Sequence, residues 1–154
     1  MDYLPLYIVC INPNREPAEY RDETIIHPLR WGLFILTDPS QGHGTLYELS
    51  GIRESYWYSG PQMHQTLDPG KSHVVKELGR IAINQVMCFN ELVDEIEIVN
   101  HVGVQEWDGK DWVLTGVWKF MEAGLIGPQN TREIVQDILN AKSVYEIEND
   151  EGIY

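Results

Sequence analysis

Short runs of β-branched and aromatic residues fill the first half of the chain and predict β-strands. The clearest runs are residues 4–12 (LPLYIVCIN), 30–38 (RWGLFILTD) and 44–51 (GTLYELSG). The second run is apolar almost throughout, which is typical of a central strand buried on both faces. The turn-forming residues between the second and third runs favour an antiparallel hairpin.

The pattern is weaker over the next part of the chain. Residues 55–61 (SYWYSGP) suit either a fourth strand or the wall of a pocket, and residues 62–73 are predicted to be a loop. Residues 74–82 (VVKELGRIA) suit a strand, although apolar and charged side chains are mixed on both of its faces.

Apolar residues then recur at three- and four-residue spacing, which predicts amphipathic helices over residues 83–97 and 110–126. The apolar positions are Val86, Phe89, Leu92, Val93 and Ile96 in the first segment, and Val113, Val117, Phe120, Met121 and Leu125 in the second. Gly124 lies where a left-handed helix cap is expected. A last helix is predicted after Asn130, which has capping-box spacing to Glu133, with a stripe of Ile134, Ile138 and Ala141.

Strands precede helices in this order, which favours an α+β fold with an antiparallel sheet packed against helices. The 154 residues, 43% of them hydrophobic, suffice for one domain, which we expect over residues 1–144. Residues 145–154 (YEIENDEGIY) are expected to be an acidic, solvated tail.

The charge and the special residues exclude several classes of function. A net charge of -13 repels polyanions, so neither nucleic acid nor an anionic membrane is an expected partner. No apolar run approaches the ~20 residues of a spanning helix, and no basic leader precedes the first strand, so we expect a cytoplasmic protein. Cys10 and Cys88 are predicted to be core residues, and no metal or nucleotide motif occurs, so neither a metal nor a cofactor is expected.

Three segments, in this order, resemble the permuted branch of the papain-like fold, which includes the lecithin:retinol acyltransferase-like proteins and fungal relatives. LRWGLFI resembles the strand that carries the catalytic histidine, and GTLYELSG resembles its hairpin partner. WDGKDWVLTGVWKFMEAGLI resembles the helix that opens with the nucleophilic cysteine. The resemblance implies a papain-like single domain whose histidine activates that cysteine and is itself oriented by a polar residue on the next strand.

All three catalytic positions differ from the family. Arg30 stands in place of the histidine, and Glu48 in place of the orienting residue. The nucleophile position falls on Gly109 if Trp112 is the motif tryptophan, or on Val104 if VQEW is aligned instead. Arginine keeps its proton near neutral pH and glycine has no side chain, so the resemblance excludes a cysteine hydrolase.

Two interpretations remain open. In the first, the site is a repurposed, non-hydrolytic enzyme of the isomerase, cyclase or lyase type in specialised metabolism. The predicted acid–base and anion-holding groups are Arg30, Glu48, Asp108 and Asp111. Its predicted substrate-binding residues, for a small organic molecule, are Trp31, Tyr47, Trp57, Trp107, Gly109 and Trp112.

In the second interpretation, the chain is a catalytically inactive binding or regulatory module. Arg30 and Glu48 then form a salt bridge across paired strands, Asp108 is a helix N-cap, and Asp111 is a first-turn acid. An enzyme is expected to show an open aromatic cleft with a carboxylate away from any cation. A binding module is expected to show Arg30 closed on Glu48 and exposed apolar side chains elsewhere. Both interpretations leave the substrate and the oligomeric state open.

Overall fold

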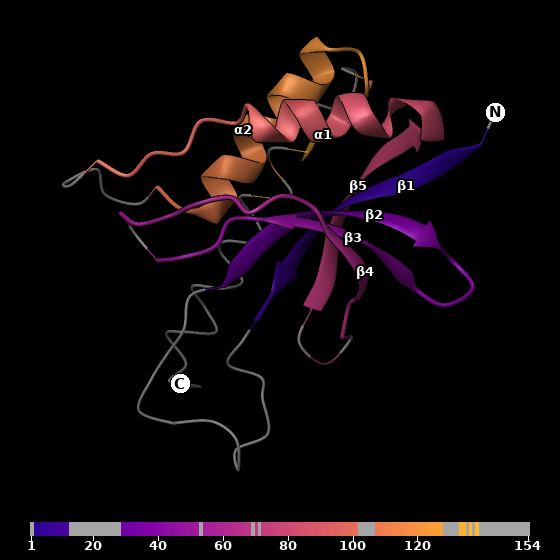
Figure 1. The fold of residues 1–154 in the computed structure, drawn as a ribbon, viewed down its shortest axis with the longest axis horizontal. Coiled ribbons are helices and arrows are strands. Elements are labelled where there is room, and N and C mark those ends of the chain that lie inside the picture. Colours follow the sequence, from indigo (N-terminus) through magenta and orange to yellow (C-terminus); the bar gives the residue numbers. More distant parts are fainter. Residues whose placement is uncertain are drawn as a thin grey trace.

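The computed structural model describes residues 2–12, 29–52, 54–68, 70, 72–101 and 107–127, and positions 133, 134, 136 and 138. In chain order the elements are β1 (Tyr3–Ile11), β2 (Arg30–Asp38), β3 (His43–Glu48), β4 (Gln62–Thr66), β5 (Ser72–Ala82), the 3-10 helix η3 (Ile83–Gln85), α1 (Val86–Asp94) and α2 (Gly109–Glu122). The chain is therefore a small α+β domain, as its sequence predicts (Figure 1). None of the described helices is both long enough and apolar enough to cross a lipid bilayer.

The five strands form one antiparallel sheet in the order β4-β3-β2-β1-β5. The predicted hairpin of β2 and β3 is confirmed, and β2 is the central strand. Side chains alternate between the two faces of a strand, and β2 is apolar on both. Trp31, Leu33 and Ile35 are buried on one face, and Phe34 is buried on the other.

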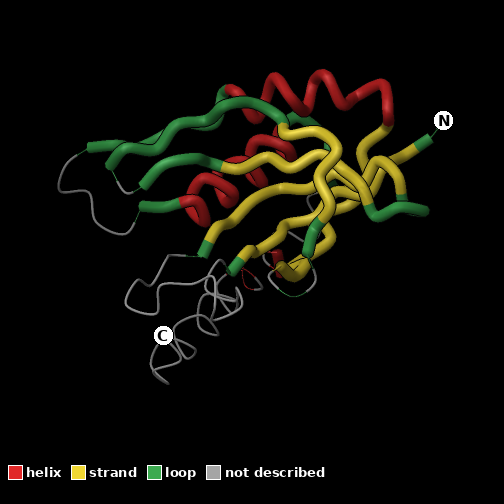
Figure 2. Tube along the Cα trace, turned by 60° about the horizontal axis from the view of Figure 1, so that its bottom comes forward, coloured by secondary structure: helices red, strands yellow, loops and turns green. Residues whose placement is uncertain are grey.

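The sheet is strongly curled. Its two edge strands, β4 and β5, would lie roughly 19 Å apart in a flat sheet, since each strand spacing is about 4.8 Å. Yet only residues 67–71 connect them, and the Ser72 amide donates to the Asp68 carbonyl at 2.8 Å, so this connection is a tight turn. Figures 1 and 2 accordingly show the strands fanning out and wrapping, so that β4 ends near the start of β5.

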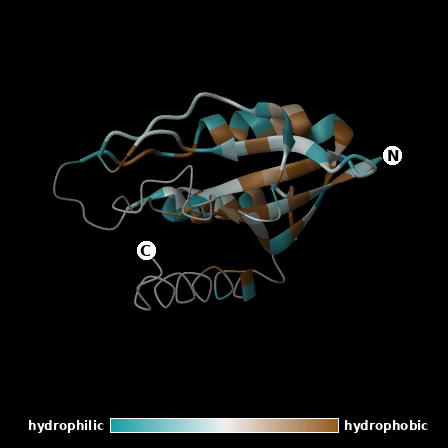
Figure 3. Ribbon diagram, turned by 90° about the horizontal axis from the view of Figure 1, so that it is seen from below, coloured by the Kyte–Doolittle hydropathy of each residue, from teal (hydrophilic) through white to brown (hydrophobic). Residues whose placement is uncertain are grey.

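Each face of the sheet has its own core. The inner face, inside the curl, carries a small cluster of Val9, Phe34 and Leu46, against which Leu67 of the β4–β5 connection packs. The helix face, which α1 and α2 cover, carries the larger cluster. Figure 3 shows the apolar residues that run along the strands and the facing helices.

The helices bury the stripes that their sequences predict. In α1, Phe89 and Val93 are buried. In α2, the buried apolar residues are Trp112, Val113, Val117 and Phe120. The Phe89 and Phe120 rings, 4.6 Å apart between centroids, pack the two helices together. Gly124 has a φ of 77°, the left-handed conformation expected just after the helix.

Two predictions about local structure are wrong, and one of the two alternatives for residues 55–61 is excluded. Residues 62–66 lie in the predicted loop but form β4, an exposed edge strand with no apolar alternation to reveal it. Residues 55–61 form no strand; Trp57 makes only an isolated bridge to Ser50. Cys88 is exposed rather than part of the core, whereas Cys10 is buried as predicted.

The mixed pattern of β5 has a structural cause. Its pairing with β1 slips twice, between Leu6 and Tyr7 and again between Ile8 and Val9. Each slip is a β-bulge, which reverses the alternation of the side chains. Leu78 and Ile81 are therefore both buried although they are an odd number of residues apart.

Some predicted features lie outside the described residues: Asn130, Ala141, Val104 and the segment 145–154. Ile134 and Ile138, from the predicted last helix, are described and are buried.

The close approach of β2 and β3 gives a direct test of the register. A Cβ atom at Gly44 would lie 2.2 Å from the Ile35 carbonyl oxygen and 2.6 Å from the Phe34 ring. We expect Gly44→Ala to lower the free energy of unfolding by about 1–3 kcal/mol, because it overpacks the strand pair. Gly109→Ala is the matched control: its Cβ would meet nothing closer than 3.6 Å, so its effect should be neutral or stabilising by less than about 1 kcal/mol. Urea denaturation measures both, and equal stability of the two variants would contradict this register.

Candidate functional site

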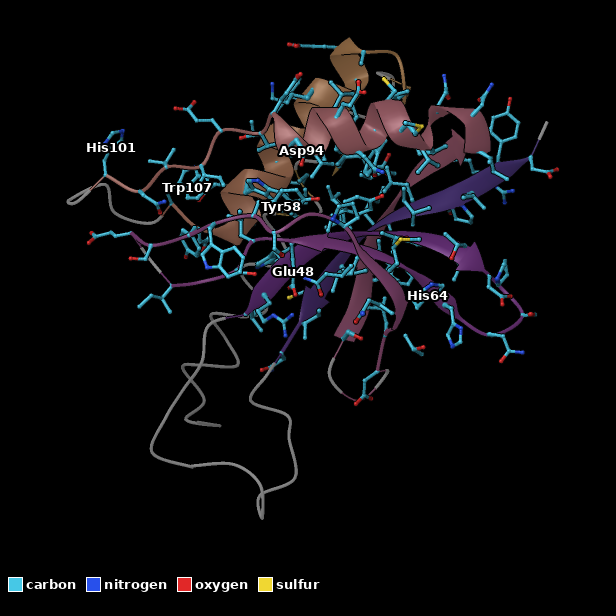
Figure 4. All side chains as sticks on the ribbon, in the orientation of Figure 1. Glu48, Tyr58, His64, Asp94, His101 and Trp107 are labelled. Atoms are coloured by element: carbon cyan, nitrogen blue, oxygen red, sulfur yellow. The ribbon has the colours of Figure 1, made fainter. Side chains whose placement is uncertain are left out.

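The sheet divides the residues that the sequence predicts to form one site. Arg30 and Trp31 are consecutive in β2, so their side chains lie on opposite faces. Trp31 and Tyr47 belong to the core on the helix face, together with Trp112 of α2. Arg30 lies on the inner face, as does Glu48. Figure 4 shows Tyr58 and Trp107 toward the helices and Glu48 across the sheet from them.

Arg30 and Glu48 form a two-point ion pair. Arg30 Nε donates to Glu48 Oε2 at 3.1 Å, and Arg30 Nη2 donates to Glu48 Oε1. Their contact is diagonal, because the residue opposite Glu48 in the register is Gly32. The Glu48 side chain is only 5% exposed, whereas that of Arg30 is 48% exposed. The carboxylate is therefore held by its cation rather than presented to a substrate.

The two aspartates at the start of α2 form a capping box. The Asp108 side chain accepts from the Lys110 amide at 3.0 Å, and the Asp111 side chain accepts from the Asp108 amide at 3.0 Å. These bonds satisfy backbone donors that a helix start leaves unpaired. Burial raises the pKa of Asp111, while its hydrogen bond from the Asp108 backbone acts in the opposite direction.

The start of α2 packs directly on β2. A Cβ atom at Gly109 would lie 3.6 Å from the Trp31 carbonyl oxygen and 3.8 Å from Trp31 Cβ, which are ordinary contacts. The resemblance implies that a helix start meets a strand in this way. The residue that faces the helix is Trp31, however, and the structure does not bring Arg30 to Gly109.

An irregular segment, which we call the aromatic arm (residues 50–52 and 54–58), runs beside the segment that follows α1 (Figures 1 and 2). The Asn100 side chain holds the two segments together, because it accepts from the Tyr56 amide and donates to the Tyr56 carbonyl, both at 2.8 Å. Tyr56 and Tyr58 face the helices: their rings contact Trp107 at 5.7 Å and Trp112 at 5.5 Å between centroids.

Trp57, between these two tyrosines, has the opposite orientation. It pairs with Ser50, is 55% exposed, and belongs to the side of the sheet that carries Arg30 and Glu48. Trp57 is therefore separated from the other tryptophans that the sequence assigns to one pocket.

A polar cluster lies within the aromatic core on the helix face. Tyr47 OH donates to Asn90 Oδ1 at 2.6 Å, which joins β3 to α1. Tyr58 OH and Trp112 Nε1 are buried and have no hydrogen-bond partner among the described residues. Burial raises the pKa of Tyr47, and burial raises that of Tyr58, with a further contribution from the Asp94 charge. Both phenols therefore keep their protons at neutral pH.

Sequence reasoning identified Tyr47 and Trp112 but missed Tyr58 and Asn90 as parts of this cluster, and missed the exposed Asp94 whose charge acts on Tyr58. Tyr58 was recognisable only as one aromatic residue of the YWY segment, with no indication of the direction in which it points. Asn90 and Asp94 lie one turn apart on α1, and nothing in their spacing distinguishes them from surface residues.

No protein-family profile, no curated protein and no solved structure matches the chain. The described residues contain no group of three or more His, Cys, Asp or Glu side chains that could hold a metal ion. The site must therefore be interpreted from its own geometry.

The ion pair can be tested by removing its cation. We expect Arg30→Met to lower the free energy of unfolding by about 1–3 kcal/mol, because it leaves the buried Glu48 carboxylate unpaired. The double variant Arg30→Met/Glu48→Leu should recover most of that loss. Glu133→Gln is the control, since it breaks an exposed pair with Lys76 and should cost less than about 0.5 kcal/mol. A loss for Arg30→Met as small as that of the control would show that the pair is not structural.

The pH dependence of stability tests the environment of Asp111. Its pKa is raised in the folded state, so the native chain binds a proton more readily there than the unfolded chain does. The contribution of Asp111 to the free energy of unfolding is therefore fully present below its pKa in the unfolded chain, near 3.8. This contribution is lost as the pH rises through the pKa of Asp111 in the folded chain. The wild type should gain stability relative to Asp111→Asn as the pH falls toward 4, measured by urea denaturation at each pH. If the wild type instead loses stability relative to Asp111→Asn as the pH falls, the capping hydrogen bond lowers the pKa of Asp111 by more than burial raises it.

Proposed function

We propose that the chain is a catalytically inactive binding module for a small organic molecule, a pseudoenzyme. The observation that carries this proposal is the closure of Arg30 on Glu48 at two points, on the face of the sheet away from the start of α2. An acid–base mechanism needs a group that is free to exchange a proton with substrate. Arg30 and Glu48 are bonded to each other, and Asp108 and Asp111 cap a helix.

We also propose that the scaffold is related to the permuted papain-like fold. The supporting observation is the contact of Gly109 with the Trp31 backbone, which joins a helix start to a strand as the resemblance implies. In this account, the indole of Trp31 fills the space on the helix face in which the family has its histidine.

Exposed apolar side chains elsewhere agree with a binding module. Ile52 and Trp57 lie in the aromatic arm and are 72% and 55% exposed. They are large apolar residues in a short irregular segment, and such residues are common at binding surfaces.

A second candidate is an acid–base enzyme of the isomerase, cyclase or lyase type. The raised pKa of Asp111 favours it, because a higher pKa brings a carboxyl group closer to the range in which it can act as a general acid or base near neutral pH. This enzyme would have to act through Asp111 rather than through Arg30 and Glu48.

A ligand screen with two readouts separates the candidates. We expect at least one compound in a panel of small organic molecules to raise the melting temperature saturably and to be recovered unchanged by mass spectrometry. At 100 times its Kd, such a ligand stabilises the fold by about 2.7 kcal/mol. Its Kd should change less than about two-fold in Arg30→Met/Glu48→Leu, because the ion pair is structural.

Conversion of a panel compound by the wild type, lost in Asp111→Asn, would instead establish the enzyme. The same compounds are also tested on the variant Trp57→Phe. Weaker binding to this variant would place the ligand on the inner face, where Trp57 and Arg30 are, and unchanged binding would place it on the helix face.

A further inference from the structure

Two aromatic side chains in contact on the helix face each carry a buried polar group. Trp112 is fully buried, and its Nε1–H group has no acceptor among the described residues. Tyr58 OH is likewise buried and unpartnered within that part of the chain, and the two rings are 5.5 Å apart between centroids. A buried polar group without a partner lowers the free energy of unfolding by about 1–3 kcal/mol. Two such groups on a pair of rings in contact are therefore explained most simply by one missing hydrogen-bond partner.

The neighbouring polar groups do not provide that partner. Asn90 Oδ1 accepts from Tyr47 OH, and it bonds to neither Tyr58 OH nor Trp112 Nε1. The aspartates in the first turn of α2 bond to backbone amides. The indole N–H can only donate, and a protonated phenol can donate as well. The two groups together therefore match a hydrogen-bond acceptor that comes from outside the described residues.

The charge around the two groups selects the kind of acceptor. Asp94 is close enough to Tyr58 to disfavour a negative charge on its oxygen. Asp108 and Asp111 lie within the same helical turn as Trp112, and they outnumber the one cation of that turn, the buried Lys110. An anionic acceptor would be repelled by these carboxylates, whereas a neutral carbonyl oxygen would not be.

A ligand would have to reach the two groups by displacing part of the aromatic arm. Tyr58 is partly exposed although its hydroxyl group is buried, and it covers Trp112, which is deeper. Figure 4 shows Tyr58 on the side of Asp94 and Trp107. A ligand ring could pack on the same aromatic side chains, since aromatic surfaces pair at 4.5–7 Å between centroids.

We propose that Tyr58 and Trp112 form a site that binds the neutral carbonyl group of a small aromatic or apolar molecule through the Tyr58 hydroxyl and the Trp112 indole N–H. This inference rests on the proposed function, and it specifies the ligand class and the face of the sheet. It places the ligand away from Arg30 and Glu48.

The indole N–H resonances of the five tryptophans provide the test. Benzamide and benzoate are the probes, because they have the same shape and differ in charge. The Trp112 signal is assigned by its loss in Trp112→Phe. We expect benzamide to shift the Trp112 indole signal saturably and to bind at least five-fold more tightly than benzoate.

Two variants complete the experiment. Tyr58→Phe keeps the ring and removes the hydroxyl group, so we expect benzamide to bind at least five-fold more weakly. Trp118→Phe, at an exposed position of α2 to which no binding role is assigned, should leave the benzamide affinity unchanged. Equal binding of benzamide and benzoate, unchanged affinity in Tyr58→Phe, or no shift of the Trp112 signal would each overturn the inference.

These failures are distinguishable from failure of the proposed function. One outcome is that a compound from the screening panel raises the melting temperature and leaves the Trp112 signal unshifted. That result would support the binding module and contradict the site at Tyr58 and Trp112. If no compound binds saturably in either experiment, both the binding module and the site at Tyr58 and Trp112 are contradicted.

Discussion

The arrangement of this protein depends on the alternation of side chains along its central strand. Successive residues of β2 point to opposite faces of the sheet, and both faces are buried. Arg30 consequently belongs to the inner face with Glu48, and Trp31 belongs to the helix face with α2. The curl of the sheet covers much of the inner face, and α1, α2 and the aromatic arm cover the helix face. The two sets of side chains therefore lie on opposite faces of the sheet and do not form one site.

Much of the fold follows from local sequence. In β2, the apolar run and the turn residues that follow it indicate the strand that the structure shows. In α2, the apolar spacing and the aspartates at its start likewise indicate the helix that the structure shows. β4 could not be recognised, because an exposed edge strand has no face to bury and QMHQT contains no apolar alternation. β5 gave a mixed pattern because its two bulges reverse the alternation, and bulges depend on the partner strand.

The candidate site was harder to predict than the fold. The resemblance predicts that Arg30 lies in a strand, and it does lie in β2. Neighbouring residues of a strand belong to opposite faces, however, and Arg30 lies on the face away from α2. The ion pair, the N-cap at Asp108 and the first-turn acid at Asp111 were predicted as non-catalytic alternatives, and all three are present. Tyr58 and Asn90 approach the core of β3 and α2 only through tertiary packing, which no spacing in the sequence encodes. The buried hydroxyl and indole groups therefore emerge from the structure alone.

The most direct measurement of the central claim is a set of nuclear Overhauser contacts at the start of β2. Our account predicts contacts between the Gly109 Hα protons and the Trp31 side chain, and between the Arg30 and Glu48 side chains. Contacts from the Arg30 side chain to Gly109 or Trp112 would contradict it. They would place the guanidinium group on the helix face and restore the single site that the structure divides.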